Sequence, residues 1–288
     1  MEFDVPEPVA VSQFIAMIGA IFSFSEAQLY ALFAVFIRVG AVVGLLPGFG
    51  ERMVSIRIRL AGALAFTAIV WPVILPELTN GAGAPLPGGT GPMGTSMAPP
   101  FDIMRIFLAE AAVGLSLGIA IRFFIFALQL AGSIAAQSTA VSQIFAGAGM
   151  PDPMPAIGNI LTIGGIALAL AADLHIKAAM TMIASYETLP FGVFPVAGDL
   201  AEWGLRRASQ AFALAFTLAA PFVVASLAYN VALGAINRAM PQLMVAFVGA
   251  PAITAGALFF LFLAGPVGLL HWSGQLDIAL MSPFGQLP

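Results

Sequence analysis

Six long apolar segments constrain the fold of this chain more than any other feature of its sequence. They cover residues 30–46, 60–75, 103–130, 157–172, 208–236 and 243–270. About 20 apolar residues in a helix span the roughly 30 Å hydrocarbon layer of a bilayer. We therefore expect an all-α membrane protein with about six long apolar helices.

The composition supports the same expectation. Of the 288 residues, 60% are hydrophobic and 8% are charged, whereas a soluble domain has about 25% charged residues. Such a chain has too few charges to cover itself with a solvated surface, so it needs a lipid bilayer, partner subunits or both. No interval between the apolar segments is long enough for a soluble domain, and we expect residues 1–288 to form a single integral membrane domain.

The stretches outside the apolar segments differ in character. Residues 1–25 hold an apolar run after an acidic start, which lacks the cations of a signal peptide and is expected to lie at the membrane interface. Residues 77–102 form a Gly/Pro-rich loop, and residues 175–207 are read as a longer, polar connector. His271 and Trp272 follow the last apolar segment and predict a membrane interface there.

A central polar stretch covers residues 129–155. It is rich in small, hydroxyl and amide side chains and contains no cation. Because apolar segments flank it on both sides, we expect a loop, a re-entrant segment or a continuation of the third helix.

Several kinds of chemistry are excluded by the residue types. The chain has no cysteine and two widely separated histidines, which excludes thiolate catalysis and disfavours a metal site. No nucleophile–base pair or phosphate-binding loop is visible, so we expect no catalytic residues, no cofactor and no enzymatic activity. The sequence has no basic patch for nucleic acid.

Arg38, Glu110 and Arg122 are charged residues that stand well inside the apolar segments. A charge in the middle of a bilayer costs about 2.5–3.5 kcal/mol on insertion scales. These residues could line an ion or substrate pathway, or they could form buried ion pairs with a neighbouring helix or subunit. We favour ion pairs, with Glu110 as a possible partner for another subunit.

Two short motifs suggest packing. Gly114-x-x-x-Gly118 allows two membrane helices to approach closely. The sequence Asn237-Arg-Ala-Met-Pro-Gln242 is a compact polar turn between two apolar segments. Its composition alone identifies no more than the turn of a helical hairpin.

Short motifs also follow one another in a fixed order along the chain. They are Arg38-Val-Gly with Leu46-Pro-Gly-Phe-Gly50 and Ile56-Arg-Ile-Arg-Leu60, then Glu110-x-x-x-Gly114-x-x-x-Gly118 with Gln129-Leu-Ala-Gly132, then Ser185-Tyr-Glu-Thr-Leu-Pro-Phe-Gly192, and finally Asn237-Arg-Ala-Met-Pro-Gln242. Together they resemble the FliR family of flagellar type III export-gate proteins. The resemblance covers about residues 28–270.

This resemblance implies a function. The chain would be a subunit of the flagellar export gate in the bacterial inner membrane, at the basal body, and would form and close the conduit for unfolded flagellar subunits. Its partners would be FliP-, FliQ- and FlhB-like subunits. Its apolar helices would form tilted helical hairpins within a multi-subunit helical assembly.

The resemblance also implies two functional regions. A plug that closes the channel would cover about residues 131–145, and the turn after the fifth segment would contact other subunits. The plug residues are Gly132, Ser133, Gln137, Ser138, Thr139, Ser142, Gln143 and Phe145, and those of the turn are Asn237, Arg238, Pro241 and Gln242. Two alternatives stay open, a small-solute secondary transporter and a subunit of a virulence injectisome.

Overall fold

The structure is a computed structural model that describes residues 26–51, 54–79, 100–139, 156–239 and 245–284. Within these residues all regular structure is helical, which confirms the predicted all-α class. The helices are α2 (Glu26–Leu45), α3 (Ile56–Thr79), α4 (Pro100–Thr139), α6 (Ala156–Ala171), α7 (Leu174–Thr188), α8 (Ala197–Ala239) and α9 (Val245–Met281).

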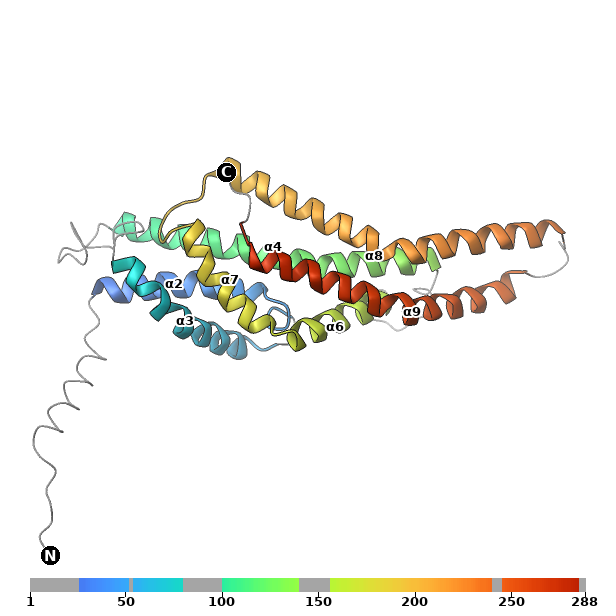
Figure 1. The fold of residues 1–288 in the computed structure, drawn as a ribbon, viewed down its shortest axis with the longest axis horizontal. Coiled ribbons are helices and arrows are strands. Elements are labelled where there is room, and N and C mark those ends of the chain that lie inside the picture. Colours follow the sequence, from blue (N-terminus) through green and yellow to red (C-terminus); the bar gives the residue numbers. More distant parts are fainter. Residues whose placement is uncertain (1–25, 52–53, 80–99, 140–155, 240–244, 285–288) are drawn as a thin grey trace, which may run out of the picture.

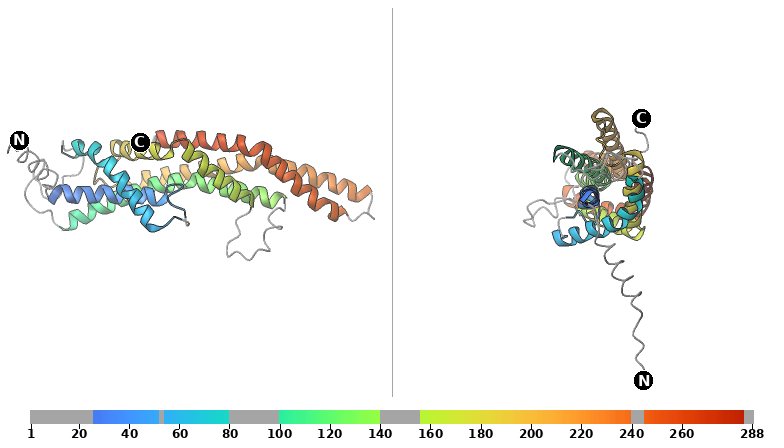
Figure 2. Two further views of the ribbon diagram at one scale, coloured as in Figure 1. Left: turned by 90° about the horizontal axis from the view of Figure 1, so that it is seen from below. Right: turned by 90° about the vertical axis from the view of Figure 1, so that its left-hand side faces the viewer.

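Helix α4 is the centre of an elongated body. It packs against α2, α6, α8 and α9. Helices α2, α3 and α7 lie toward one end of the long axis, and the hairpin of α8 and α9 extends past the other helices at the opposite end (Figure 1). The view along the long axis shows the helices gathered around it (Figure 2).

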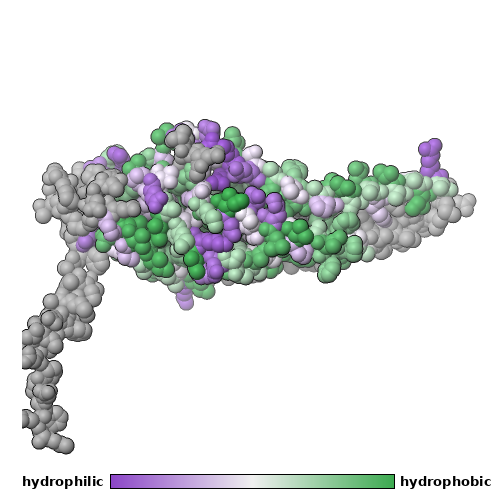
Figure 3. All heavy atoms as spheres, viewed as in Figure 1, coloured by the Kyte–Doolittle hydropathy of each residue, from purple (hydrophilic) through white to green (hydrophobic). Residues whose placement is uncertain are grey.

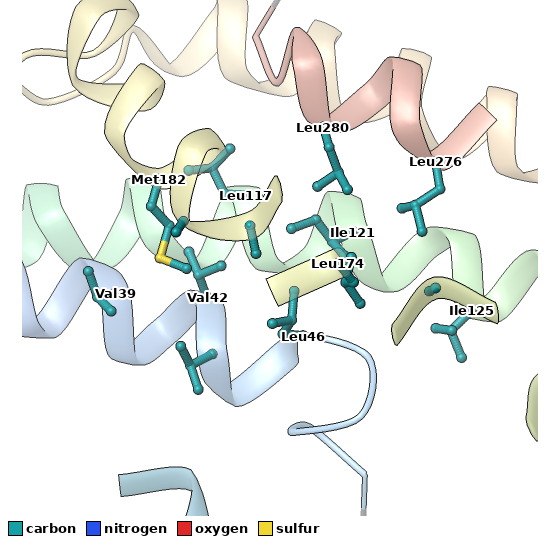
Figure 4. Packing of buried hydrophobic residues seen from close by; sticks show 14 of the residues in the cluster. Val39, Val42, Leu46, Leu117, Ile121, Ile125, Leu174, Met182, Leu276 and Leu280 are labelled. Atoms are coloured by element: carbon teal, nitrogen blue, oxygen red, sulfur yellow. The ribbon is translucent and has the colours of Figure 1, made fainter. Parts of the chain in front are cut away.

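The hydrophobic core extends through all seven described helices. Figure 4 shows the part of it to which α2, α4, α7 and α9 contribute. The side chains labelled there are Val39 and Val42 of α2 with Leu46 just after it, Leu117, Ile121 and Ile125 of α4, Leu174 and Met182 of α7, and Leu276 and Leu280 of α9. The residues of α4 recur every four positions, which places them on one face of the helix.

Five helices are long and apolar enough to cross a membrane: α2, α3, α4, α8 and α9. Helices α6 and α7 meet at an angle of 74° and could together form a sixth span. The chain is therefore a multi-pass membrane protein, in agreement with the six segments read from the sequence.

The prediction that residues 175–207 form a connector between two apolar helices is wrong, because most of this interval is helical. Helix α7 begins at Leu174, and α8 already begins at Ala197. Leu174, Ala178, Met182 and Tyr186 are buried at intervals of four residues, so this stretch is an amphipathic helix with one interior face. His175, Lys177 and Glu187 interrupt its apolar residues, so no long apolar run marks this helix in the sequence.

One other boundary also differs from expectation. Helix α3 continues to Thr79 and α4 begins at Pro100, so the two helices reach further at both ends than the predicted loop 77–102 allows. Helix α4 continues to Thr139, so the first part of the central polar stretch continues the third helix, which is one of the three possibilities expected there. Residues 1–25, which carry the predicted interfacial run, lie outside the described residues.

Trp272 packs inside the helix bundle. Its side chain is fully buried, and its indole Nε1 donates a hydrogen bond of 2.8 Å to the carbonyl oxygen of Phe124 of α4. A buried indole N–H needs such a partner, so Trp272 connects α9 to α4. The membrane interface expected at His271 and Trp272 stays a prediction.

Glycines bring three helices into backbone contact. A Cβ atom at Gly114 would lie 2.4 Å from the carbonyl oxygen of Arg38, and one at Gly118 would lie 2.8 Å from Leu45 Cδ1. The close packing expected of this motif is therefore confirmed between α4 and α2. A Cβ atom at Gly132 would lie 2.1 Å from the Cα atom of Gly158, so α4 and α6 also touch through their backbones.

Alanine substitutions on the two sides of the contact between α4 and α6 should have different effects on stability. Gly132→Ala should destabilise the protein by at least about 1–3 kcal/mol, because the new methyl group overlaps the backbone of α6. Gly158→Ala should be neutral or slightly stabilising, since its Cβ atom would lie 3.5 Å from the nearest atom and alanine favours the helix. Thermal unfolding of the detergent-solubilised variants measures both, and equal midpoints would contradict the contact.

Candidate functional site

A buried ion pair lies between the first and third apolar segments. Arg38 of α2 and Glu110 of α4 both have 0% of their side chains exposed. Arg38 Nε lies 2.7 Å from Glu110 Oε2, and Arg38 Nη2 donates to Glu110 Oε1 at 3.0 Å. The pair therefore joins α2 to α4 through two contacts.

Groups from α7 and from the chain after it add further hydrogen bonds to both members of the pair. Arg38 Nη1 donates to Ser185 Oγ at 3.2 Å, and both Nη atoms donate to the carbonyl oxygen of Leu189 at 3.1 Å. Glu110 accepts from the Tyr186 hydroxyl at 3.2 Å and from the Gly192 backbone N–H at 2.8 Å. We call these residues the Arg38 network.

The Arg38 guanidinium also stacks on an aromatic ring. Its Cζ atom lies 3.8 Å from the centre of the Tyr186 ring, a distance at which the ring face attracts a cation. Tyr186 therefore contacts both members of the ion pair, the arginine through its ring and the glutamate through its hydroxyl.

The local sequence explains how the network assembles. Gly114 follows Glu110 by one helical turn, on the same face of α4. Because its missing Cβ atom lets the backbone of α2 approach, Arg38 and Glu110 come within contact distance. At the other side, Gly192 has a φ of 69°, a left-handed conformation that glycine adopts without strain. This turn aims its N–H at Glu110.

The geometry of the Arg38 network favours a structural ion pair over an ion or substrate pathway. A buried ion pair offsets the loss of hydration only when further hydrogen bonds satisfy the remaining lone pairs and protons. Both charges here have such bonds. The expectation that Glu110 pairs with another subunit differs from the structure, in which its partner is Arg38 of the same chain.

Arg122 lies in a different environment from the one expected. Its Nη1 atom lies 2.8 Å from Glu51 Oε1, and the two side chains are 18% and 28% exposed. Arg59 Nη2 also donates to the carbonyl oxygen of Glu51, at 2.6 Å. This pair is therefore at the surface of the described structure and not in its core. Glu51 was missed because it stands in the turn before α3, outside every apolar segment.

The predicted plug residues begin inside α4. Gly132 contacts α6, and the Ser133 and Ser138 hydroxyls donate to carbonyl oxygens of their own helix at Leu130 and Ile134. Gln137 is exposed. Thr139 ends α4, with its side chain outside the described part, and Ser142, Gln143 and Phe145 lie outside the described residues.

The end of α4 is tied to α8 by a contact that the sequence did not reveal. Ser226 of α8 donates its hydroxyl to the carbonyl oxygen of Ser138, and Asn230 Nδ2 lies 3.5 Å from Ser226 Oγ. We call this the Ser226 contact. A serine and an asparagine one turn apart in an apolar helix are its sequence signal.

The predicted subunit-contact turn follows the end of α8. Asn237 and Arg238 belong to the last turn of α8, and the Arg238 side chain is exposed. The Asn237 side chain, Pro241 and Gln242 lie outside the described part. Within that part, no three His, Asp or Glu side chains are grouped so that they could hold a metal ion.

The chain is similar to known bacterial export proteins. Residues 29–278 match the family described as "Bacterial export proteins, family 1". The flagellar biosynthetic protein FliR of Caulobacter vibrioides is 33% identical over 227 residues, which cover 78% of this chain and 84% of that protein. FliR of Escherichia coli is 26% identical, with 75% and 76% covered. FliR of Aquifex aeolicus is also 26% identical, with 88% and 92% covered.

The two ion pairs should differ strongly in their contribution to stability. Arg38→Ala should cost about 3–5 kcal/mol, because it leaves the Glu110 carboxylate buried without its cation. Arg122→Ala serves as the control and should cost about 0–1 kcal/mol, since its pair is partly exposed. Thermal unfolding in detergent and the amount of protein in membranes measure both.

A double variant separates charge balance from packing. In Arg38→Met/Glu110→Met no buried charge is left unpaired, so it should be more stable than either single variant. A double variant that is less stable than both would contradict this account of the pair.

Proposed function

Because this chain belongs to the FliR family, we infer that it is a subunit of the flagellar protein export apparatus. The observation that carries this inference is the match over residues 29–278, nearly the whole helical structure. The chain is a multi-pass membrane protein, and we propose that its membrane is the bacterial inner membrane at the flagellar basal body. We propose that it works there as one membrane domain without catalytic activity of its own.

The lengths of the helices support a place within a larger helical assembly. Helices α4, α8 and α9 have 40, 43 and 37 residues. At 1.5 Å per residue they are about 60, 65 and 55 Å long, about twice the hydrocarbon layer of roughly 30 Å. An upright helix of this length extends well beyond the hydrocarbon layer, so each of these helices must tilt strongly or continue outside the lipid, where its apolar side chains favour a protein partner.

The surface supports the same arrangement. Large apolar side chains of α8 and α9 are exposed along both helices, among them Phe212, Phe216, Leu227, Phe262 and Val267. Hydrophilic side chains gather across the middle of the body, and the part toward the α8–α9 tip is mainly apolar (Figure 3). We propose that FliP-, FliQ- and FlhB-like subunits and the bilayer cover these surfaces.

The end of α4 supports a role in closing a channel for unfolded flagellar subunits. Residues 132–138 carry mainly small side chains, with two hydroxyls and one amide and no charge, and Gln137 among them is exposed. Small and neutral polar side chains can be wetted and yet bind no single side chain tightly, as a conduit for varied unfolded chains requires. Packed small and apolar residues can also block ions by excluding water. We propose that about residues 131–145 close the conduit at rest.

The rival functions are less well supported. A small-solute transporter usually has a midplane site built on broken helices, often with internal repeats, and we see no convincing repeat in the sequence. An injectisome subunit is disfavoured because the relatives described above are flagellar proteins.

The assignment to flagellar export predicts a specific loss in cells. Deletion of the gene should abolish swimming and the secretion of flagellar subunits, because the gate would lack a component, and a plasmid copy should restore both. The purified chain alone in liposomes should transport no small solute. Swimming and secretion that survive deletion would contradict the assignment to flagellar export.

The Ser226 contact gives a test of the proposed closure. Ser226→Ala removes one hydrogen bond, worth about 0.5–1.5 kcal/mol, and should therefore raise the open population about 2- to 12-fold. The expected result is a larger ion leak through an otherwise complete gate, measured as a loss of membrane potential in cells that are not secreting.

Thr217→Ala is the matched control for this test. The Thr217 hydroxyl donates to Ala213 within its own helix, so its removal leaves the link between α8 and α4 in place. Equal ion leak in the two variants would rule out a role of the Ser226 contact in closure.

A further inference from the structure

The first turns of α8 have few interior contacts of their own. In the described stretch from Ala197 to Gln210, Trp203 is the single buried residue. Leu205, two positions later, is 72% exposed. The position of this part of α8 therefore depends on what packs against Trp203.

The C-terminal segment supplies that contact. After α9 ends at Met281, the chain places Phe284 against Trp203, with ring centroids 5.2 Å apart and an interplanar angle of 38°. The Phe284 side chain is 2% exposed. An aromatic pair at this distance stabilises beyond the apolar area that it buries.

Two side chains of α8 bind the backbone of the same segment. Trp203 Nε1 donates to the carbonyl oxygen of Pro283 at 3.1 Å. Arg207, one turn later, donates from Nη2 to the carbonyl oxygens of Ser282 and Pro283 at 3.0 and 3.1 Å. These carbonyls follow the C-terminal end of α9, where a cation is favoured by the helix dipole.

A small apolar pocket lies beside this contact. Arg207 and Pro283 line it together with Ile121 and Phe124 of α4 and Leu276 of α9. Thr181 of α7, which also lines the pocket, donates its hydroxyl to the carbonyl oxygen of Leu280 at 2.8 Å. The end of α9 is thus held by α7 on one side and by α8 on the other.

We propose that Trp203 and Arg207 form a binding site for a Pro-Phe peptide segment, and that the chain's own residues 282–284 occupy it. Trp203 provides the aromatic surface for the phenylalanine, and the two side-chain donors recognise the adjacent carbonyl oxygens. Occupation of the site locks the start of α8 to the end of α9.

This site goes beyond the proposed export function. The match to the family ends at residue 278, so the bound segment lies outside the part of the chain on which that function rests. The test below reads local backbone opening and needs no export activity, so either proposal can fail without the other.

Hydrogen–deuterium exchange of the full-length protein in detergent tests the lock. Phe284→Ala should speed amide exchange at residues 197–206 by at least about tenfold, because the first turns of α8 lose the contact that closes them. Exchange in α2 should stay unchanged. Met281→Ala is the matched control, since Met281 is 77% exposed and adjoins the same segment.

A peptide experiment tests recognition directly. A fluorescent peptide with the sequence of residues 282–288 should bind Phe284→Ala protein, whose aromatic site is open, and should restore slow exchange at residues 197–206. It should bind wild-type protein at least about tenfold more weakly, because the chain's own segment competes. A peptide with alanine in place of the phenylalanine should not bind.

Several results would overturn the proposal. They are unchanged exchange at residues 197–206 in Phe284→Ala, equal acceleration in Met281→Ala, or no binding of the peptide. If Phe284→Ala speeds exchange throughout the protein, the variant Trp203→Phe replaces it as the test of the site. This variant keeps an aromatic ring against Phe284 and removes the indole N–H that donates to Pro283. Acceleration confined to residues 197–206 then supports the site, and its absence refutes it.

Discussion

The burial of one arginine in an apolar helix is the constraint on which the rest of the structure depends. An unpaired cation would be too costly in that position, so α2 must lie against a carboxylate, and α4 supplies Glu110. Glu110 can reach Arg38 because Gly114 lets the two backbones touch. The remaining hydrogen-bonding capacity of the pair then fixes α7 and the turn at Gly192. One electrostatic requirement thus determines the arrangement of three helices and a loop.

Helix α8 is held at separate points along its length. Its first turns contact the C-terminal segment through Trp203, and its middle contacts the end of α4 through Ser226. Beyond Ser226, most of its side chains are exposed up to Ala239. The base of the α8–α9 hairpin is therefore fixed within this chain, whereas its distal part depends on lipid and on the subunits that we propose to surround it.

The sequence predicts the long helices well because their apolar length alone requires them. It fails where the signal depends on contacts distant in sequence. Helix α7 is short, and charged and polar residues interrupt its apolar ones, so the sequence favours a connector there although the helix buries one face. The partner of Arg38 could not be chosen from the sequence, because the choice depends on where Gly114 lets α2 cross α4. The hydrogen bond from the buried Trp272 to Phe124 of α4 also joins residues too distant in sequence to be predicted.

The Arg38 network also imposes an order on biosynthesis. Glu110 follows Arg38 by 72 residues, which at 5–20 residues per second is a delay of about 4–14 s during synthesis. During that interval the first apolar helix carries a cation whose partner has not yet been made. Until α4 is made, Arg38 is more stable where water or lipid headgroups can solvate it than at the centre of the bilayer. The ion pair therefore couples the final depth of α2 to the arrival of α4.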